Sequence, residues 1–351
     1  MTENNVDFEN LSLLELGFSP YFRSQLSLED LELLQPVRVT EVQRDRLQAL
    51  GENKQLELRL TASMSAGEFA IGDWVLIDEN QRVVRLLSPK SSLSRRAAGT
   101  DSVVQLIANN VDTLFIVTSC NADFNAARLE RYLALAKEAD VNPIIILTKA
   151  DLSDQVSKLQ RKTQILMADI TVLPVNATDK NIHAELAPWC GTGQTVALVG
   201  SSGVGKTTLT NALTGENSTT QEIREDDAKG KHTTTFRSMR PTRTGGWVID
   251  TPGMRALRLH ESSEGIKAVF EDIIETASQC RYNNCQHDSE PGCAVQLAID
   301  NGDLDADRLR RWKKLSRENL HNTQSVADSR KREKKFSKSV KQAMKGKRRR
   351  H

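Results

Sequence analysis

The sequence has no run of about 18 consecutive apolar residues, which is the length that a membrane-spanning helix requires. Its first residues, Met1 to Asn10, are acidic and polar and lack the pattern of a signal peptide. Five cysteines in 351 residues are too few for a disulfide scaffold. We therefore expect a cytoplasmic protein without a membrane partner, and its length allows about two or three domains.

Charge is unevenly distributed, although the net charge is only +2. The segment from Arg330 to His351 holds twelve Lys or Arg residues and one acid, Glu333, so it carries +11 and leaves −9 on the remainder. Such a basic tail, which we place at 326–351, indicates a polyanionic partner. The alternative is a solvated end, and the two are compatible because basic arms often order only on nucleic acid.

Alternating apolar and polar residues predict short β-strands between residues 36 and 90. Val37–Val42 and Leu56–Leu60 alternate, and a glycine turn precedes the apolar run Trp74–Ile77. Strands at this spacing indicate a small β-barrel of the OB type. Such barrels bind nucleic acid or only protein, and the pattern leaves both open. Residues 1–35 form an extension to which we assign no function.

Residues 100–260 change to alternating strands and helices. Near-continuous apolar runs separated by helical segments predict a parallel sheet covered on both faces. The predicted strands are Thr113–Val117, Ile144–Leu147, Val172–Val175, Val196–Val199 and Trp247–Ile249. Residues 88–105, rich in Ser and Arg, form a connector that we expect to be mobile.

A glycine-rich motif with the spacing of a phosphate loop lies between the strand Val196–Val199 and the helical run Thr208–Thr214. Its glycines let backbone N–H groups point at phosphates, and the helix N-terminus adds positive charge. We expect Lys206 to contact the β- and γ-phosphates of a nucleotide and Thr207 to bind Mg²⁺. The residues predicted to hold the nucleotide here are Gly200, Ser201, Ser202, Gly203, Val204, Gly205, Lys206, Thr207 and Thr208.

Two later segments have the sequence of nucleotide-dependent switches. In the segment Asp250-Thr251-Pro252-Gly253, Asp250 would hold Mg²⁺ through water and the Gly253 N–H would sense the γ-phosphate. In Gly230–Thr235, a threonine would close over Mg²⁺ and be released on hydrolysis, and we favour Thr234. The alternative for this threonine run is an exposed strand of high β-propensity.

A base-reading box, Thr148-Lys149-Ala150-Asp151, follows the strand Ile144–Leu147. The Asp151 carboxylate can accept two hydrogen bonds from guanine, a pair that adenine cannot donate, so it favours GTP over ATP. Asparagine is usual where Thr148 stands, and the shorter side chain predicts fewer contacts and a modest nucleotide affinity. Asn176 and Ala177, after the next strand, are predicted to support the base.

The order of these boxes is unusual, because the base-reading box precedes the phosphate loop and the Asp250 switch follows both. An ordinary GTPase begins with the phosphate loop and ends with the base-reading box, so the order predicts a circularly permuted GTPase domain. Met254 stands where many GTPases have a water-orienting glutamine, so we expect slow unaided hydrolysis. His232 either orients the water or packs the switch loop.

Three cysteines and one histidine cluster near the C-terminal side, with the spacing Cys-x4-Cys-x-His-x5-Cys. Three thiolates and an imidazole suit tetrahedral Zn²⁺, and a closed four-ligand site is structural rather than catalytic. The alternative is a set of unrelated reduced cysteines. The predicted ligands of one Zn²⁺ per chain are Cys280, Cys285, His287 and Cys293.

The permuted boxes, the Gly-Lys-His-Thr-Thr-Thr segment, Asp-Thr-Pro-Gly and the Cys–His cluster together resemble the RsgA (YjeQ) family of bacterial GTPases of small-subunit biogenesis. The likeness covers about residues 36–300. It implies an OB domain at 36–90, the permuted GTPase domain at 100–260 and a zinc-binding helical module at 261–325, all acting on 16S rRNA. It also implies that the small subunit stimulates GTP hydrolysis, which is coupled to release from a nearly mature particle.

The sequence thus predicts a monomeric, multidomain α/β GTPase. Its expected partners are GTP or GDP with Mg²⁺, one structural Zn²⁺, and the small ribosomal subunit with its 16S rRNA. Two alternatives stay open. One is a GTPase that acts on another RNA or on translation itself. The other is a nucleotide-gated RNA-binding or scaffold protein whose turnover is incidental, an alternative that Met254 keeps open.

Overall fold

The computed structural model describes residues 10–61, 64–96, 104–121, 124–216, 238–250 and 262–323. The chain divides into two compact units. The first comprises Met1–Ser94 with Leu106–Ala256, and the second comprises Arg95–Gln105 with Leu257–His351. Within the described ranges, no helix is both long enough and apolar enough to cross a membrane.

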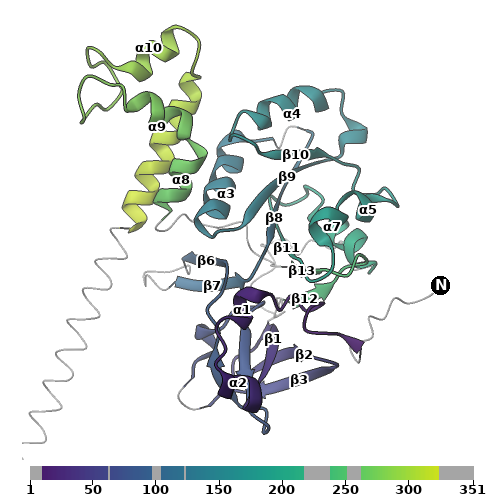
Figure 1. The fold of residues 1–351 in the computed structure, drawn as a ribbon. Helices are drawn as coiled ribbons and strands as arrows, with labels where there is room; N and C mark the ends of the chain where they lie inside the picture. Colours follow the sequence, from purple (N-terminus) through teal and green to yellow (C-terminus); the bar gives the residue numbers. More distant parts are fainter. Residues whose placement is uncertain are drawn as a thin grey trace, which may run out of the picture. The chain divides into compact units, whose positions relative to one another are not determined.

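The first unit contains an antiparallel sheet of five strands in the order β3-β2-β1-β4-β5 (Figure 1). The strands are β1 (Gln35–Val42), β2 (Arg46–Gly51), β3 (Lys54–Arg59), β4 (Trp74–Ile77) and β5 (Val83–Leu86). Their alternating apolar residues form one core, which includes Val37, Leu47 and Val75. The predicted strands are confirmed, but β2 was not foreseen because Gln48, Ala49 and Gly51 have little preference for strands.

The larger sheet has six strands in the order β10-β9-β8-β11-β13-β12. They are β8 (Thr113–Ser119), β9 (Asn142–Thr148), β10 (Thr171–Pro174), β11 (Thr195–Val199), β12 (Ser238–Pro241) and β13 (Trp247–Asp250). All five predicted strands are present and parallel. The sixth, β12, is an antiparallel edge strand against β13.

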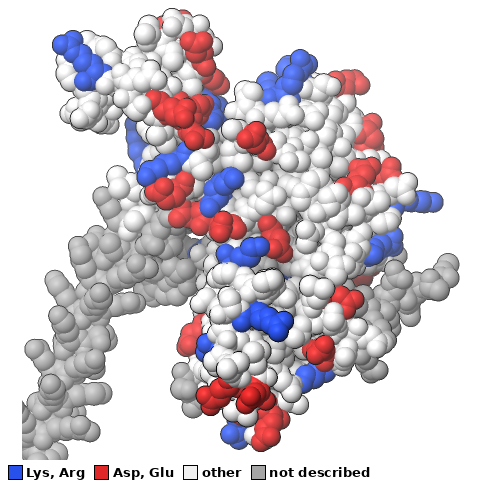
Figure 2. All heavy atoms as spheres, in the orientation of Figure 1, with Lys and Arg blue, Asp and Glu red and all other residues white. Residues whose placement is uncertain are grey.

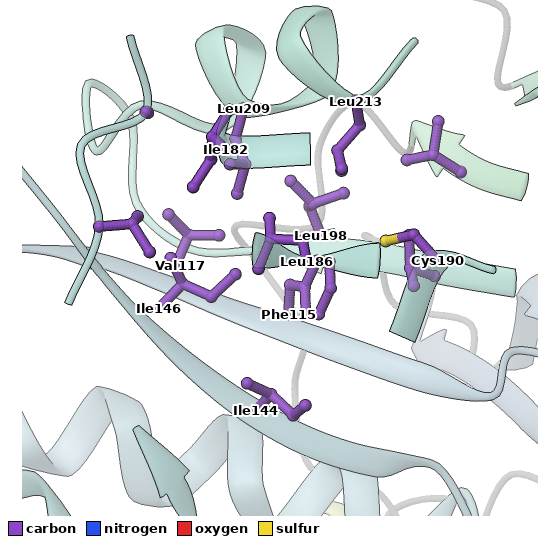
Figure 3. Packing of buried hydrophobic residues seen from close by; sticks show 14 of the residues in the cluster. Phe115, Val117, Ile144, Ile146, Ile182, Leu186, Cys190, Leu198, Leu209 and Leu213 are labelled. Atoms are coloured by element: carbon purple, nitrogen blue, oxygen red, sulfur yellow. The ribbon is translucent and has the colours of Figure 1, made fainter. Parts of the chain in front are cut away.

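Helices cover both faces of this sheet, as the apolar strands predict. On one face, α5 (Ile182–Glu185), α6 (Ala187–Cys190) and α7 (Lys206–Thr214) bury Ile182, Leu209 and Leu213 against the strand residues Phe115 and Ile146 (Figure 3). On the other, α3 (Ala126–Glu138) and α4 (Val156–Gln164) contact β8, β9 and β10. The packed strands therefore fix the positions of the loops that follow their carboxyl ends.

The N-terminal extension is part of the first unit and packs against both sheets. It contains α1 (Pro20–Arg23) and α2 (Leu28–Leu33). Phe18 lies edge-on to Trp74 of β4, with ring centroids 4.9 Å apart. The Trp247 indole N–H of β13 donates a 2.8 Å hydrogen bond to the Glu15 carbonyl. The extension thus joins the five-stranded sheet to the six-stranded one.

A buried ionic network reinforces this junction. The Arg38 guanidinium of β1 donates to the Leu16 carbonyl at 2.6 Å and to Thr195 Oγ1 of β11 at 2.7 Å. Asp73 is fully buried and accepts hydrogen bonds of 2.7 Å from Ala70 N and from Asn109 Nδ2. Burial raises the pKa of Asp73 to about 6, against the opposing effects of these donors and of Arg38.

One short strand lies within the segment 88–105, which we expected to be a mobile connector, and a second begins at its end. β6 (Ser92–Arg96) and β7 (Val104–Asn109) pair as a two-stranded sheet. The connector therefore contains paired strand residues, while its mobility stays a prediction. Arg95 Nε donates 3.0 Å to Gln105 Oε1 across the pair, a contact that composition alone does not reveal.

The second unit is helical around the cysteine cluster, as predicted. Its helices are α8 (Ser263–Val269), α9 (Glu271–Ala277), α10 (Ala294–Asp300) and the helical residues 306–323. Arg308 is buried and bonds to both carboxylate oxygens of Asp272, at 2.7 and 2.9 Å, and to the Val269 carbonyl. This pairing fastens the last described helix to α8 and α9.

Candidate nucleotide-binding site and metal centre

The predicted nucleotide-binding residues follow the carboxyl ends of parallel strands. The chain runs outward from β8 through β9 to β10, then returns to β11 on the other side of β8. The point between β8 and β11 is therefore a topological switch point, where open α/β sheets bind ligands. The phosphate loop follows β11 directly, and the base-reading box follows β9. The fold thus brings together residues that lie far apart in the sequence.

The phosphate loop has the backbone that its glycines predict. Gly200 has φ of +146°, and a Cβ there would lie 2.1 Å from the Val117 carbonyl oxygen. Gly205 has φ of +94° and precedes the first turn of α7, which begins at Lys206. The Lys206 ammonium donates to the Gly200 carbonyl at 2.9 Å and to the Ser201 carbonyl. The loop therefore curls around a lysine charge at a helix N-terminus, an arrangement suited to phosphate.

The base-reading box is hydrogen-bonded to the phosphate loop. Thr148 is fully buried, and its hydroxyl lies 2.6 Å from the Val204 carbonyl and 3.3 Å from the Thr118 carbonyl. Lys149 adopts a left-handed backbone with φ of +57°, and its ammonium donates 3.0 Å to the Gly203 carbonyl. These contacts fix the spacing between the two loops, which determines whether one nucleotide can reach both.

The side that would face the base is formed by two adjacent loops. Asp151 lies in a short 3-10 helix and is exposed. The Ala150 N–H donates 3.3 Å to the Val175 carbonyl, which immediately precedes Asn176. Asn176 Oδ1 accepts hydrogen bonds from the backbone and hydroxyl of Thr178, so it shapes its own turn. Ala177 is buried beneath this turn.

Several of the predicted switch residues lie outside the described residues. This holds for Gly253, Met254, His232 and Thr234. The Asp250 backbone is described: it ends β13 and pairs with Ser238 of β12. β13 lies next to β11, so Asp250 ends on the same edge of the sheet as the phosphate loop.

The four predicted zinc ligands converge in the second unit. Their ligand atoms all lie within 4.8 Å of one another. His287 Nδ1 is 3.6 Å from Cys280 Sγ and 3.5 Å from Cys293 Sγ, and these two sulfurs are 3.9 Å apart. Ligands at normal zinc bond lengths in a tetrahedron are about 3.5–3.8 Å apart. The donor set and its spacing therefore fit one Zn²⁺.

The surroundings shift the pKa values of these groups in different directions. Burial raises the pKa of the Cys285 thiol to about 11, which disfavours its thiolate. Burial lowers the pKa of His287, which favours the neutral imidazole. Burial alone would raise the pKa of the Cys280 thiol, but hydrogen bonds from the backbone N–H groups of Val295 and Ala294 and with the thiols of Cys293 and Cys285 together lower it. The His287 carbonyl accepts from Gln296 Nε2 at 2.6 Å and from the Lys313 ammonium at 3.1 Å.

Sequence reasoning missed Glu290, which shapes the loop between the last two predicted ligands. Its carboxylate accepts backbone hydrogen bonds from Gln286 at 2.8 Å, Asp288 at 2.9 Å and Ser289 at 3.2 Å. These donors hold the pKa of Glu290 at about 2. Its place in a short turn between predicted ligands was the available signal.

Two family models match parts of the chain. The family model described as RsgA GTPase matches residues 86–260. A second model, described as ABC transporter, matches residues 188–346, a range that includes the phosphate loop shared by many nucleotide-binding proteins.

Curated relatives match over most of the chain. Small ribosomal subunit biogenesis GTPase RsgA 2 of Vibrio vulnificus is 49% identical, over 93% of each chain. Small ribosomal subunit biogenesis GTPase RsgA of Mesorhizobium japonicum is 50% identical, over 89% of this chain and 91% of the relative.

Two solved structures share the fold. YjeQ from Thermotoga maritima has a TM-score of 0.60 at 21% identity and covers 82% of this chain and 99% of its own. YloQ, described as a circularly permuted GTPase, has a TM-score of 0.57 at 23% identity and covers 81% and 95%. With the permuted boxes on one sheet edge and curated relatives about half identical over most of both chains, the chain belongs to the RsgA GTPase family and is a GTP hydrolase.

Proposed function

We propose that this protein binds the small ribosomal subunit and its 16S rRNA, assists late maturation of the subunit, and hydrolyses GTP to GDP and phosphate with stimulation by the subunit. The observation that carries the proposal is the hydrogen-bonded junction of base-reading box and phosphate loop, in a chain about half identical to proteins named small ribosomal subunit biogenesis GTPases. The junction supports guanine-nucleotide binding, and the relatives' names support the ribosomal partner.

The nucleotide contacts follow from the site. Asp151 reads guanine, with the loop at Asn176 and Ala177 beside it. The backbone from Gly200 to Gly205 and the first turn of α7 hold the phosphates. Lys206 exchanges its carbonyl partners for the β- and γ-phosphates. Thr207 and Asp250 hold the Mg²⁺ that accompanies GTP, and this ion neutralises phosphate charge during hydrolysis.

Three switch residues complete the proposed cycle. Thr234 closes over the Mg²⁺ site, and Gly253 contacts the γ-phosphate through its N–H. His232 orients the attacking water, because Met254 has no group that can. On this proposal, hydrolysis is slow until the bound small subunit completes the catalytic site.

The remaining parts contact RNA. The strand order β3-β2-β1-β4-β5 supports an OB-type barrel at residues 36–90 as one RNA-binding surface. The four ligands Cys280, Cys285, His287 and Cys293 support a structural Zn²⁺ that orders the second unit for rRNA. The tail at 326–351 adds affinity for the RNA backbone that weakens with salt. The protein acts as a monomer in the cytoplasm, without a membrane partner.

Co-sedimentation with purified small subunits tests this function. Wild-type protein should pellet with them when bound to a non-hydrolysable GTP analogue and be released with GDP. Lys206→Ala removes the charge at the phosphates and should abolish the difference between the two nucleotides. If Lys206→Ala is released from subunits as the wild type is, nucleotide does not control binding and the proposal fails.

A further inference from the structure

Helix α2 is the most unusual surface element of the first unit. It is six residues long, Leu28–Leu33, and none of its residues is buried. The exposed fractions of Leu28, Leu31 and Leu33 are 82%, 51% and 64%. A helix this short is unstable alone and is normally held by burying an apolar face. Here the apolar residues point into solvent, so packing does not explain why the helix forms.

Polar contacts hold α2 in place instead. Ser27 and Asp30 form a reciprocal capping box at its N-terminus. Asp30 also forms a 2.7 Å ion pair with Arg85 of β5, and Arg85 bonds to the Gln25 carbonyl at 3.1 Å. Two hydrogen bonds between Gln25 and Ser88 fasten the preceding turn to the end of β5. The helix is therefore presented in a fixed position against the edge of the barrel strands.

The neighbouring strand β5 also carries exposed apolar side chains. Val84 and Leu86, on either side of Arg85, are exposed at 50% and 38%. Five of the large apolar side chains exposed among the described residues thus belong to two adjacent elements. Exposed apolar side chains that lie close together, as Leu28, Leu31 and Leu33 do on one short helix, mark interaction sites.

Charge identifies the kind of partner. The helix carries three acids, Glu29, Asp30 and Glu32, and no basic residue. Arg85 neutralises Asp30, which leaves Glu29 and Glu32 exposed beside the leucines. Acidic side chains gather over α2 in the lower part of Figure 2. Carboxylates repel RNA phosphates, whereas a segment that combines Lys or Arg with apolar side chains complements both features.

We propose that α2 is a docking surface for a basic, apolar segment of a protein of the small ribosomal subunit. The inference rests on the proposed function and adds a protein contact to the RNA contacts. The leucines supply the apolar burial, and Glu29 and Glu32 pair with the partner's cations. The capping box and the Arg85 ion pair hold the helix ready for binding.

Photocrosslinking from position 31 identifies the partner. Full-length protein with benzoylphenylalanine in place of Leu31 is irradiated with purified small subunits and a non-hydrolysable GTP analogue, and the products are mapped by mass spectrometry. We expect a crosslink to a subunit protein, within a segment containing Lys or Arg and apolar residues. A crosslink only to rRNA, to a second copy of this chain or to its own tail, or no crosslink, overturns the proposal.

Binding measurements on variants test the contribution of the leucines to subunit binding. Leu28→Ser combined with Leu31→Ser should weaken subunit binding about tenfold, the result of losing roughly 1.4 kcal/mol of apolar contact. Its melting temperature and GTP affinity should stay at wild-type values, because both side chains are exposed. Ile165→Ser, which removes another side chain of comparable exposure at the end of α4, is the matched control and should not change binding. Unchanged binding of the double variant contradicts the docking role.

Charge reversal distinguishes protein from RNA. Glu29→Lys with Glu32→Lys should weaken binding if the partner is a basic protein segment, and should strengthen it if RNA lies against α2. Wild-type protein that fails to bind small subunits would overturn the proposed function. Wild-type binding with unaltered binding of both double variants would overturn only the role of α2.

Discussion

The hydroxyl of Thr148 donates a 2.6 Å hydrogen bond to the carbonyl of Val204 and so joins the base-reading box to the phosphate loop. Because threonine is shorter than the usual asparagine, we expected residue 148 to make fewer contacts to the base and to the phosphate loop. This contact to the phosphate loop is nevertheless present. Both residues are buried, Val204 at 1% exposure. A carbonyl in such a place is costly to leave without a donor.

Thr148→Val should therefore weaken the binding of GTP and GDP together by about tenfold. The change keeps the shape of the side chain but leaves the Val204 carbonyl without its donor, a loss of about 1–3 kcal/mol. Titration calorimetry with both nucleotides measures the effect. Thr118→Val is the matched control, because Thr118 is buried on the adjacent strand and its hydroxyl has no hydrogen-bond partner among the described residues. Equal affinities for wild type and Thr148→Val would show that the contact does not support the loop.

Asp151→Asn should reduce GTP affinity by about 100-fold or more, because an amide cannot accept both hydrogen bonds that guanine donates. The same variant should gain affinity for xanthosine triphosphate, whose base carries a carbonyl where guanine has its amine. Competition binding with the two nucleotides measures the exchange. Asp154→Asn, an exposed acid three residues further along, should leave the preference unchanged. Retained GTP preference in Asp151→Asn would remove that residue from the base site.

Local sequence patterns were sufficient to predict the boxes and the strands that carry them. The glycines at 200 and 205 are recognisable because the local backbone geometry requires them. The strands are recognisable because each is a continuous apolar run. The contacts between the boxes could not be predicted, because Thr148 and Val204 are separated by 56 positions and meet only through the strand order. The cluster of Cys280, Cys285, His287 and Cys293 could be predicted because these residues lie close together in the sequence.

The role of the extension was also beyond sequence reasoning. The Glu15 carbonyl accepts a hydrogen bond from Trp247, which is 232 positions away in the sequence. Every residue has a backbone carbonyl, so no sequence pattern indicates this contact. Arg38 is charged and sits in an alternating strand, so its pattern favours exposure, yet it is 1% exposed. Its partners are the Leu16 carbonyl, the Asn110 carbonyl and the Thr195 hydroxyl, none of which its own sequence neighbourhood indicates.

Cys293→Ser should lower the zinc content from about one atom per chain to near zero. A serine hydroxyl is a poor replacement for a thiolate, and three remaining ligands leave the site open. Mass spectrometry of the native protein measures the metal. Cys120→Ala is the control, because Cys120 is buried in the first unit and is distant from the cluster in the sequence. Its zinc content should stay at the wild-type value. Zinc absent from wild-type protein purified without chelator would contradict the site.

The buried Asp73 should make stability depend on pH between about 4 and 6. Its pKa is raised from 3.8 to about 6 by burial, so the folded state holds its proton more tightly than the unfolded state. The stabilising effect is present below the unfolded pKa and is lost as the pH rises through the folded value. Relative to Asp73→Asn, the wild-type unfolding free energy should fall by about 3 kcal/mol across this range. Denaturant titrations of both proteins at several pH values measure it, and parallel curves would contradict the raised pKa.

The central claim is that the small ribosomal subunit activates this GTPase, and steady-state GTP turnover tests it most directly. Met254 provides no water-orienting group, so turnover of the isolated protein should be slow. Purified small subunits should raise it by about 10-fold or more, and Lys206→Ala should remain inactive with them. Large subunits and tRNA serve as polyanionic controls and should have little effect. Stimulation by small subunits that is no greater than stimulation by these controls would contradict the account.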